Sequence, residues 1–114
     1  MLKTNWIVIA DDDADDCLLF KDVLEDLNIK KDLVIKTNGR ELLDHLFKVD
    51  HAPEFIFLDM NMPLMDGMES LAEIRKCTRF QNVPIIVFST SSHQQTVKKA
   101  YNAGANLFIR KPDS

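Results

Sequence analysis

Short apolar runs without alternation constrain the fold of this chain more than any other feature of its sequence. A strand with one solvent-exposed face alternates apolar and polar residues, whereas a strand covered on both faces is apolar throughout. Continuous runs therefore predict a parallel sheet with helices on both sides. The runs are "WIVIA" (6–10), "FIFL" (55–58), "PIIVF" (84–88) and "LFI" (107–109), with a weaker one, "LVIK", at 33–36.

The segments between these runs carry apolar residues at helical spacing, so strands and helices alternate along the chain. Asp66 with Glu69 and Ser92 with Gln95 have capping-box spacing, and Gly104 suits a helix C-terminus. This order predicts a doubly wound α/β fold, and a length of 114 residues predicts one domain over 1–114. The helical positions are Leu19, Phe20, Val23, Leu24 and Leu27; Leu42, Leu43, Leu46 and Phe47; Met68, Leu71, Ala72 and Ile74; and Val97, Ala100 and Tyr101.

Polar side chains directly follow four of the predicted strands. Asp11 and Asp12 follow the first strand, Asp59 the third, Ser89 the fourth and Lys111 the fifth. Ligands of doubly wound sheets bind beyond the carboxyl ends of the strands. A lone carboxylate after a strand more often caps a helix, but five groups placed by one topological rule indicate a site at this edge.

The stretch "IADDDADDCLLF" (9–20) crowds five aspartates into six positions. We assign only the first two, Asp11 and Asp12, to the site. Asp13, Asp15 and Asp16 are expected at the cap and first turn of the following helix, where carboxylates are favoured by the helix N-terminus.

The chain resembles the receiver domain of bacterial two-component response regulators, most of all the stand-alone type. The acidic pair after the first strand, "LDMNMPLMDG" (58–67), the Ser-Thr after the fourth strand and the "KP" after the fifth occur in the order and spacing of that family, and the likeness covers residues 6–112. The resemblance implies a flavodoxin-like receiver fold with a five-stranded parallel sheet of order 2-1-3-4-5.

The resemblance also implies the chemistry of the site. Asp59 would accept a phosphoryl group from a phosphohistidine of a sensor histidine kinase or a histidine phosphotransfer protein, or from a small donor such as acetyl phosphate. Asp12, Asp59 and the backbone carbonyl of Asn61 would bind Mg²⁺ directly, and Asp11 through water. The residue types suit this role, because Mg²⁺ prefers oxygen ligands and an anionic nucleophile attacking a phosphoryl group needs nearby cations.

A conformational switch and a fixed lysine follow from the same resemblance. Ser89 matches the hydroxyl that contacts the phosphoryl group, and Lys111 matches the lysine of the family pattern, which a cis peptide bond to Pro112 would aim into the site. Phosphorylation would draw Ser89 inward and let Phe108 rotate into the released space, which alters the surface of the fourth strand, fourth helix and fifth strand. Phe108 stands where many receivers have Tyr, so output contacts that need a phenolic hydroxyl are not expected.

Family members continue into a fifth helix, whereas this chain ends at "RKPDS" (110–114), so we expect that helix to be missing or truncated. One face of the sheet near strands one and five should then expose apolar area. The candidate explanations are a shortened version of a longer protein, a neighbouring chain that fills the groove, or a variant poor in helix. We expect self-association, or lower stability than that of a longer version.

Composition excludes some classes of function. A net charge of −4 without a basic stripe argues against direct nucleic-acid binding, so the expected partners are the kinase and a downstream protein target. No apolar run reaches the length of a membrane span and no signal peptide is present, which predicts a cytoplasmic protein. We expect buried free thiols at Cys17 and Cys77 and surface histidines at 45, 51 and 93. We expect the methionines at 60, 62, 65 and 68 to pack in the loop and helix after Asp59. The alternative for these methionines is a surface that faces a partner protein.

The favoured interpretation is a signalling module that catalyses only its own phosphorylation and dephosphorylation, and three other interpretations compete with it. A phosphatase of the haloacid dehalogenase type would use Asp11 and Asp13 after the first strand, but needs more acidic ligands and a longer chain. A pseudo-receiver that only docks would need none of the site residues. An EF-hand loop starting at Asp11 would have Asp16 at its sixth position, where Gly is required, and Asp22 at its twelfth, where Glu is usual.

Overall fold

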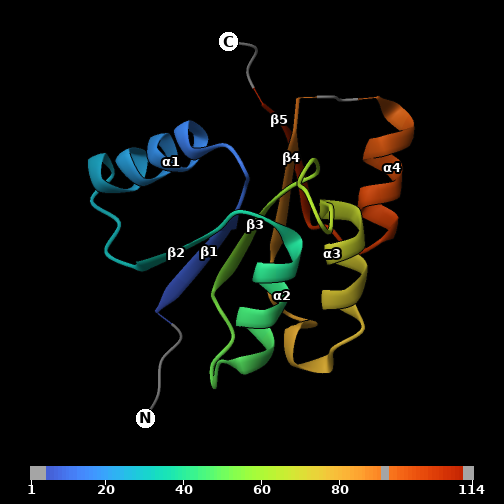
Figure 1. Ribbon diagram of the computed structural model, residues 1–114, viewed down its shortest axis with the longest axis horizontal. Coiled ribbons are helices and arrows are strands. Elements are labelled where there is room, and N and C mark those ends of the chain that lie inside the picture. Colours follow the sequence, from blue (N-terminus) through green and yellow to red (C-terminus); the bar gives the residue numbers. More distant parts are fainter. Residues whose placement is uncertain (1–4, 91–92, 112–114) are drawn as a thin grey trace.

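The computed structural model describes residues 5–90 and 93–111, and these form one five-stranded parallel sheet with helices on both faces (Figure 1). The order of the strands is β2-β1-β3-β4-β5, as the family resemblance implied. Each apolar run of the sequence became a strand. The strands are β1 Trp6–Ala10, β2 Asp32–Lys36, β3 Phe55–Asp59, β4 Ile85–Ser89 and β5 Leu107–Arg110.

Helices follow the first four strands, so the predicted alternation is confirmed. A short 3-10 helix, η1 Thr78–Phe80, lies between α3 and β4. The α-helices are α1 Ala14–Asp26, α2 Gly39–Lys48, α3 Gly67–Arg75 and α4 Gln94–Asn102.

Local hydrogen bonds explain where these helices begin and end. Asp66 and Glu69 form the predicted capping box at the start of α3. Gly104 has a φ of +113°, and its N–H donates to the carbonyl oxygen of Tyr101, which closes α4 as predicted. The N-cap of α4 is His93, without a side-chain cap, and Ser92 lies outside the described residues.

The main core lies between one face of the sheet and three helices, α2, α3 and α4, which stand side by side in Figure 1. Phe57 of β3 points to the opposite face, because side chains alternate along a strand. There Phe20 of α1 packs against it with a ring separation of 4.7 Å. The main core includes Val8 and Ala10, Ile56 and Leu58, Ile85 and Val87, Leu42 and Leu46, Leu71 and Ile74, and Ala100.

The face that carries α1 is only partly covered. Leu107 and Ile109 of β5 are nearly half exposed, as expected for strand five. The expectation was wrong for strand one, because Ile7 and Ile9 are buried on the face that α1 occupies. The exposed apolar side chains of this face therefore lie on β5, at Phe55 of β3 and at Ile35 of β2, and not on β1.

Other residue types largely have the packing roles expected of them. Met60 and Met62 belong to the core, and Met65 and Met68 pack against it, which supports packing over a partner-facing surface. Cys17 is buried and Cys77 half-buried, and both are free thiols. No helix among residues 5–90 and 93–111 is long and apolar enough to cross a membrane.

Gly67 provides a test of how tightly α3 is packed against the edge of the sheet. A Cβ at this position would lie 2.3 Å from the carbonyl oxygen of Asp59 and 2.7 Å from the Cα of Met60, both of which are backbone atoms. We expect Gly67→Ala to lower the free energy of unfolding by about 2 kcal/mol, because backbone must move to admit the methyl group. Urea denaturation measures this, with Gln95→Ala at an exposed position of α4 as the control. Equal stability of the two variants would contradict the packing described.

Candidate phosphoryl and metal site

Three carboxylates meet at the carboxyl edge of the sheet, where neighbouring strands β1 and β3 end. Ala10 pairs with Leu58, so the residues that follow them reach the same level of the sheet. One oxygen from each of Asp11, Asp12 and Asp59 lies within 4.8 Å of the others. Asp11 and Asp59 are buried and Asp12 is exposed, so the cluster opens to solvent on the side of Asp12.

Asp11 is held on both sides by the backbone. Its N–H donates to the carbonyl oxygen of Lys36 at 2.9 Å, and its Oδ1 accepts from the N–H of Asp13 at 2.9 Å. Burial raises the pKa of Asp11 to about 7, although the hydrogen bonds from Asp13 and Lys111 oppose this shift and the charge of Asp59 adds to it. A positive charge nearby would therefore stabilise the ionised form of Asp11, which burial disfavours.

Lys111 supplies an ammonium to the carboxylates. Its backbone N–H donates to the carbonyl oxygen of Ser89 at 2.7 Å, which extends the pairing of β5 with β4 beyond Arg110. Its Nζ lies 3.0 Å from Asp11 Oδ2 and 3.2 Å from Asp59 Oδ2, and 5.0 Å from the ring centroid of Phe88. The bond from Lys111 to Pro112 lies outside the described residues, so the expected cis peptide stays a prediction.

A third carboxylate, from Asp16, also binds this ammonium. Lys111 Nζ is 2.8 Å from Asp16 Oδ2, the shortest of the three contacts. Burial alone would lower the pKa of Lys111, but its hydrogen bonds to Asp16 and Asp11 raise it, and the same contact lowers the pKa of Asp16. The assignment of Asp16 to helix stabilisation alone was therefore wrong. Its position in the first turn of α1 gave no signal of a partner 95 residues away.

Two of the other predicted site residues, Asn61 and Ser89, lie at this edge of the sheet, whereas Phe108 lies further back on β5. The N–H of Asn61 is 3.4 Å from Asp59 Oδ1, so the loop after β3 turns back towards the carboxylate. Ser89 is buried at the end of β4, beside β3 in the sheet. Phe108 is half-buried and packs against the main core, and its N–H donates to the hydroxyl of Tyr101 at 3.0 Å.

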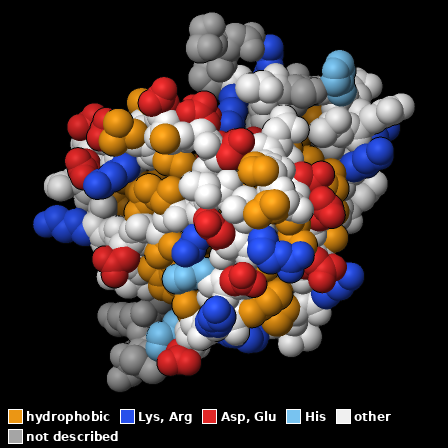
Figure 2. All heavy atoms as spheres, in the orientation of Figure 1, with side chains coloured by type: hydrophobic (Ala, Val, Ile, Leu, Met, Phe, Trp, Pro, Cys, Tyr) orange, Lys and Arg blue, Asp and Glu red, His pale blue; other side chains and the backbone are white. Residues whose placement is uncertain are grey.

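The charge balance of the site favours a bound cation. Two carboxylates about 4 Å apart at an effective dielectric of about 20 repel by about 4 kcal/mol. Lys111 offsets part of this repulsion, but its single positive charge is shared among three carboxylates, those of Asp11, Asp16 and Asp59. The remaining acidic oxygens, with Asp12 open to solvent, are the donor set that a hard divalent ion prefers. Figure 2 shows acidic side chains gathered over the start of α1.

The aspartates of the acidic stretch divide in a way that disfavours two alternative interpretations. Asp13 Oδ1 accepts from the N–H groups of Asp15 and Asp16, so this carboxylate caps α1 as predicted. It is therefore not placed as the second acid of a haloacid dehalogenase site. An EF-hand would need Asp11, Asp13 and Asp15 around one ion, whereas among the described residues the acidic cluster joins Asp11 and Asp12 to Asp59.

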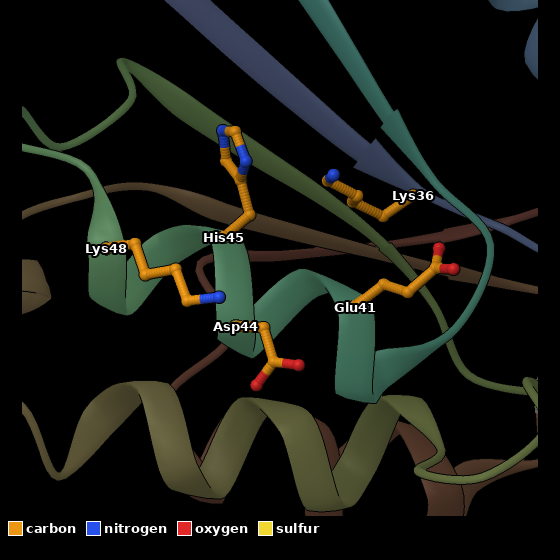
Figure 3. Close-up of a pocket in the computed structure, with 5 residues that line it drawn as sticks. All are labelled: Lys36, Glu41, Asp44, His45 and Lys48. Carbon is orange, nitrogen blue, oxygen red and sulfur yellow. The ribbon is translucent and has the colours of Figure 1, made fainter.

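A separate open hollow of about 320 Å³ lies between the end of β2 and α2 (Figure 3). Its side chains are Lys36, Glu41, Asp44, His45 and Lys48, so acids and bases are mixed. Glu41 accepts from both the N–H and the hydroxyl of Thr37, and the ring of His45 packs edge-on against Trp6. Glu41 and His45 thus have structural partners, and the candidate site is the edge near Asp59, where the carboxylates and Lys111 converge.

Comparison with known proteins agrees with this geometry. The family model of the response regulator receiver domain matches residues 7–114. The response regulator Rcp1 of Synechocystis is 29% identical over 110 residues, which are 92% of this chain and 75% of that protein. The sensor histidine kinase CheAY of Helicobacter pylori is 33% identical over 112 residues, which are 97% of this chain but only 14% of that protein.

Solved structures give the same result. The phosphorylated cyanobacterial phytochrome response regulator RcpA superposes with a TM-score of 0.90 at 26% identity, covering 98% of this chain and 84% of that one. The Mn²⁺-bound form of Rcp1 gives 0.89 at 28% identity, covering 96% and 83%. The chain belongs to the response regulator receiver domain family. It is a phosphoacceptor signalling module of two-component systems.

The raised pKa of Asp11 predicts a pH dependence of stability in the metal-free protein. The folded state holds this proton more tightly than the unfolded chain, whose ordinary value is 3.8. Asp11 therefore favours folding below about pH 4, and this contribution is lost as the pH rises through about 7. Relative to Asp11→Asn, the wild type should lose roughly 3 to 4 kcal/mol of unfolding free energy over that interval.

Urea denaturation from pH 4 to 8 in the presence of a chelator measures the difference between the two proteins. Ionisable groups that do not contact Asp11 titrate alike in the two proteins, so their contributions cancel in the difference. Parallel curves for wild type and Asp11→Asn would show that Asp11 is not held protonated by the fold.

Proposed function

We propose that Asp59 is the phosphoacceptor and that Lys111 and a divalent ion neutralise the charge of the incoming phosphoryl group. One observation carries this proposal: the Nζ of Lys111 lies 3.2 Å from Asp59 Oδ2, within a cluster where Asp11 and Asp12 also converge. A nucleophile, a fixed cation and an acidic ion site are the parts that phosphoryl transfer to a carboxylate requires.

In the proposed reaction an oxygen of Asp59 attacks phosphorus in line with the leaving nitrogen of a phosphohistidine. The new O–P bond forms as the P–N bond breaks, and the electron pair of that bond returns to the imidazole. Lys111 donates N–H groups to the phosphoryl oxygens, where negative charge is concentrated, and the Ser89 hydroxyl donates to the same group. Preformed donors act strongly here because Asp59 and Ser89 are both buried.

The residues at this edge fit Mg²⁺, and the donor set is the test of that fit. Asp11, Asp12, Asp59 and the backbone carbonyl of Asn61 would hold the ion, with Asp11 acting through water. All four offer oxygen, as Mg²⁺ prefers. When bound, the ion would supply positive charge to the phosphoryl oxygens. The similar protein Rcp1 has a Mn²⁺-bound form, which supports the proposal that this domain also binds a divalent ion.

The signal would pass from Ser89 to the surface of β4, α4 and β5. Lys111 is joined to Ser89 through the backbone, and Phe108 pairs in register with Val87 of β4. A shift of Ser89 towards the phosphoryl group would change the space beside Phe108 and allow its ring to reorient. Coupling of about 1 to 3 kcal/mol is enough to shift the population of such a two-state surface.

The setting that we propose is a cytoplasmic phosphorelay. The donor would be a sensor histidine kinase or a histidine phosphotransfer protein, and the output a protein target on the altered surface. Some relatives carry receiver sequences within larger enzymes, such as a protein-glutamate methylesterase of which the match covers 30%. For this domain we propose no reaction beyond its own phosphorylation and dephosphorylation.

Intact-mass analysis after incubation with acetyl phosphate and Mg²⁺ tests the assignment of Asp59. The wild type should gain one phosphoryl group, and Asp59→Asn should gain none, because the amide lacks the anionic nucleophile. Omitting Mg²⁺ should reduce the adduct by at least about tenfold, since the ion and Lys111 share the charge.

Asp44→Asn is the matched control, because Asp44 is an exposed acid on α2 outside the site. It should be phosphorylated as the wild type is. An adduct that persists in Asp59→Asn would move the acceptor elsewhere, and the absence of any adduct on wild type, also with a histidine phosphodonor, would favour a pseudo-receiver.

A further inference from the structure

Asp16 has an unusual role for an acid at its helical position. With Asp13 as the N-cap, it is the third residue of α1, where an acidic side chain commonly returns to the N–H of the cap. That N–H is already taken, because Asp13 donates it to Asp11 Oδ1 at 2.9 Å. The carboxylate of Asp16 turns instead to Lys111 Nζ, at 2.8 Å.

The ammonium of Lys111 has no donor to spare in this arrangement. An ammonium carries three N–H groups, and Lys111 meets three carboxylate oxygens, those of Asp16, Asp11 and Asp59. A phosphoryl oxygen that takes one of these N–H groups must displace one of the three carboxylates.

Solvent exposure decides which carboxylate can be released at least cost. In the metal-free protein the side chain of Asp11 is 0% exposed and that of Asp59 is 5% exposed, so bulk water has little access to either once Lys111 leaves. The side chain of Asp16 is 37% exposed and water can solvate it once Lys111 leaves. Asp16 is thus the replaceable partner, although its contact is the shortest of the three.

We propose that Asp16 is a positioning residue that holds Lys111 before phosphorylation and competes with the phosphoryl oxygens for its ammonium. This inference rests on the proposed function of Asp59 and Lys111. Asp16 sets how readily the ammonium of Lys111 can bind the phosphoryl oxygens. Its negative charge also opposes the approach of an anionic phosphodonor. The contact therefore stabilises the resting protein and slows its phosphorylation.

Loss of the contact between Asp16 and Lys111 should therefore lower stability but raise the rate of phosphorylation. These opposite effects distinguish the proposed role from a merely structural one. Asp16→Asn keeps the size of the side chain and an acceptor oxygen but removes the charge that makes the contact strong. We expect phosphorylation by acetyl phosphate to be about three to ten times faster than in wild type, and the melting temperature of the metal-free protein to fall by about 2 to 6 °C. A structural role alone would lower both stability and rate.

Asp15→Asn is the matched control. Asp15 lies in the same turn of α1 and carries the same charge, but within the described part of the chain its exposed carboxylate has no ion pair. Both variants lose one charge from the first turn of α1, so any change in general attraction for the donor, in helix stability or in Mg²⁺ binding is shared. The rates are measured at saturating Mg²⁺ by intact mass against time, and unfolding is followed by circular dichroism.

A faster Asp16→Asn with a lower melting temperature, beside an Asp15→Asn close to wild type, supports the competition. Equal rates for the two variants, or a slower Asp16→Asn, overturn it and leave the assignment of Asp59 intact. A wild type that cannot be phosphorylated at all overturns the proposed function, and the competition with it.

Discussion

Mutual repulsion among carboxylates at one edge of the sheet is the constraint on which the rest of this structure depends. Asp11, Asp12 and Asp59 converge there, and Asp16 joins them through Lys111. Such a group is unfavourable unless positive charge balances it, and one ammonium does so only in part. Burial raises the pKa of Asp11 in the first place, and the charge of Asp59 adds to that rise. A site built in this way is prepared to receive a cation and, beside it, a phosphoryl group.

The topology explains why one lysine can reach so many partners. In the order β2-β1-β3-β4-β5, Lys111 follows the edge strand β5. Its side chain extends over Phe88 of β4 to Asp59 at the end of β3 and Asp11 after β1. It therefore joins the edge strand of the proposed output surface to the centre of the sheet.

Much of the fold could be predicted from sequence because its signals are local. The apolar runs gave the strands, and the spacing of Asp66 and Glu69 gave the start of α3. The edge of the sheet that carries the site followed from topology alone. Contacts between distant segments could not be predicted: burial of Ile7 and Ile9 depends on where α1 packs, and the partner of Asp16 depends on how far Lys111 reaches.

Calorimetric titration of the metal-free protein with Mg²⁺ tests most directly whether this acidic edge is an ion site. The account predicts one ion per chain, with affinity at least about tenfold weaker in Asp12→Asn, which removes the exposed carboxylate of the cluster while sparing the contacts of Lys111. Binding that is undetectable in the wild type, or unchanged in Asp12→Asn, would contradict it.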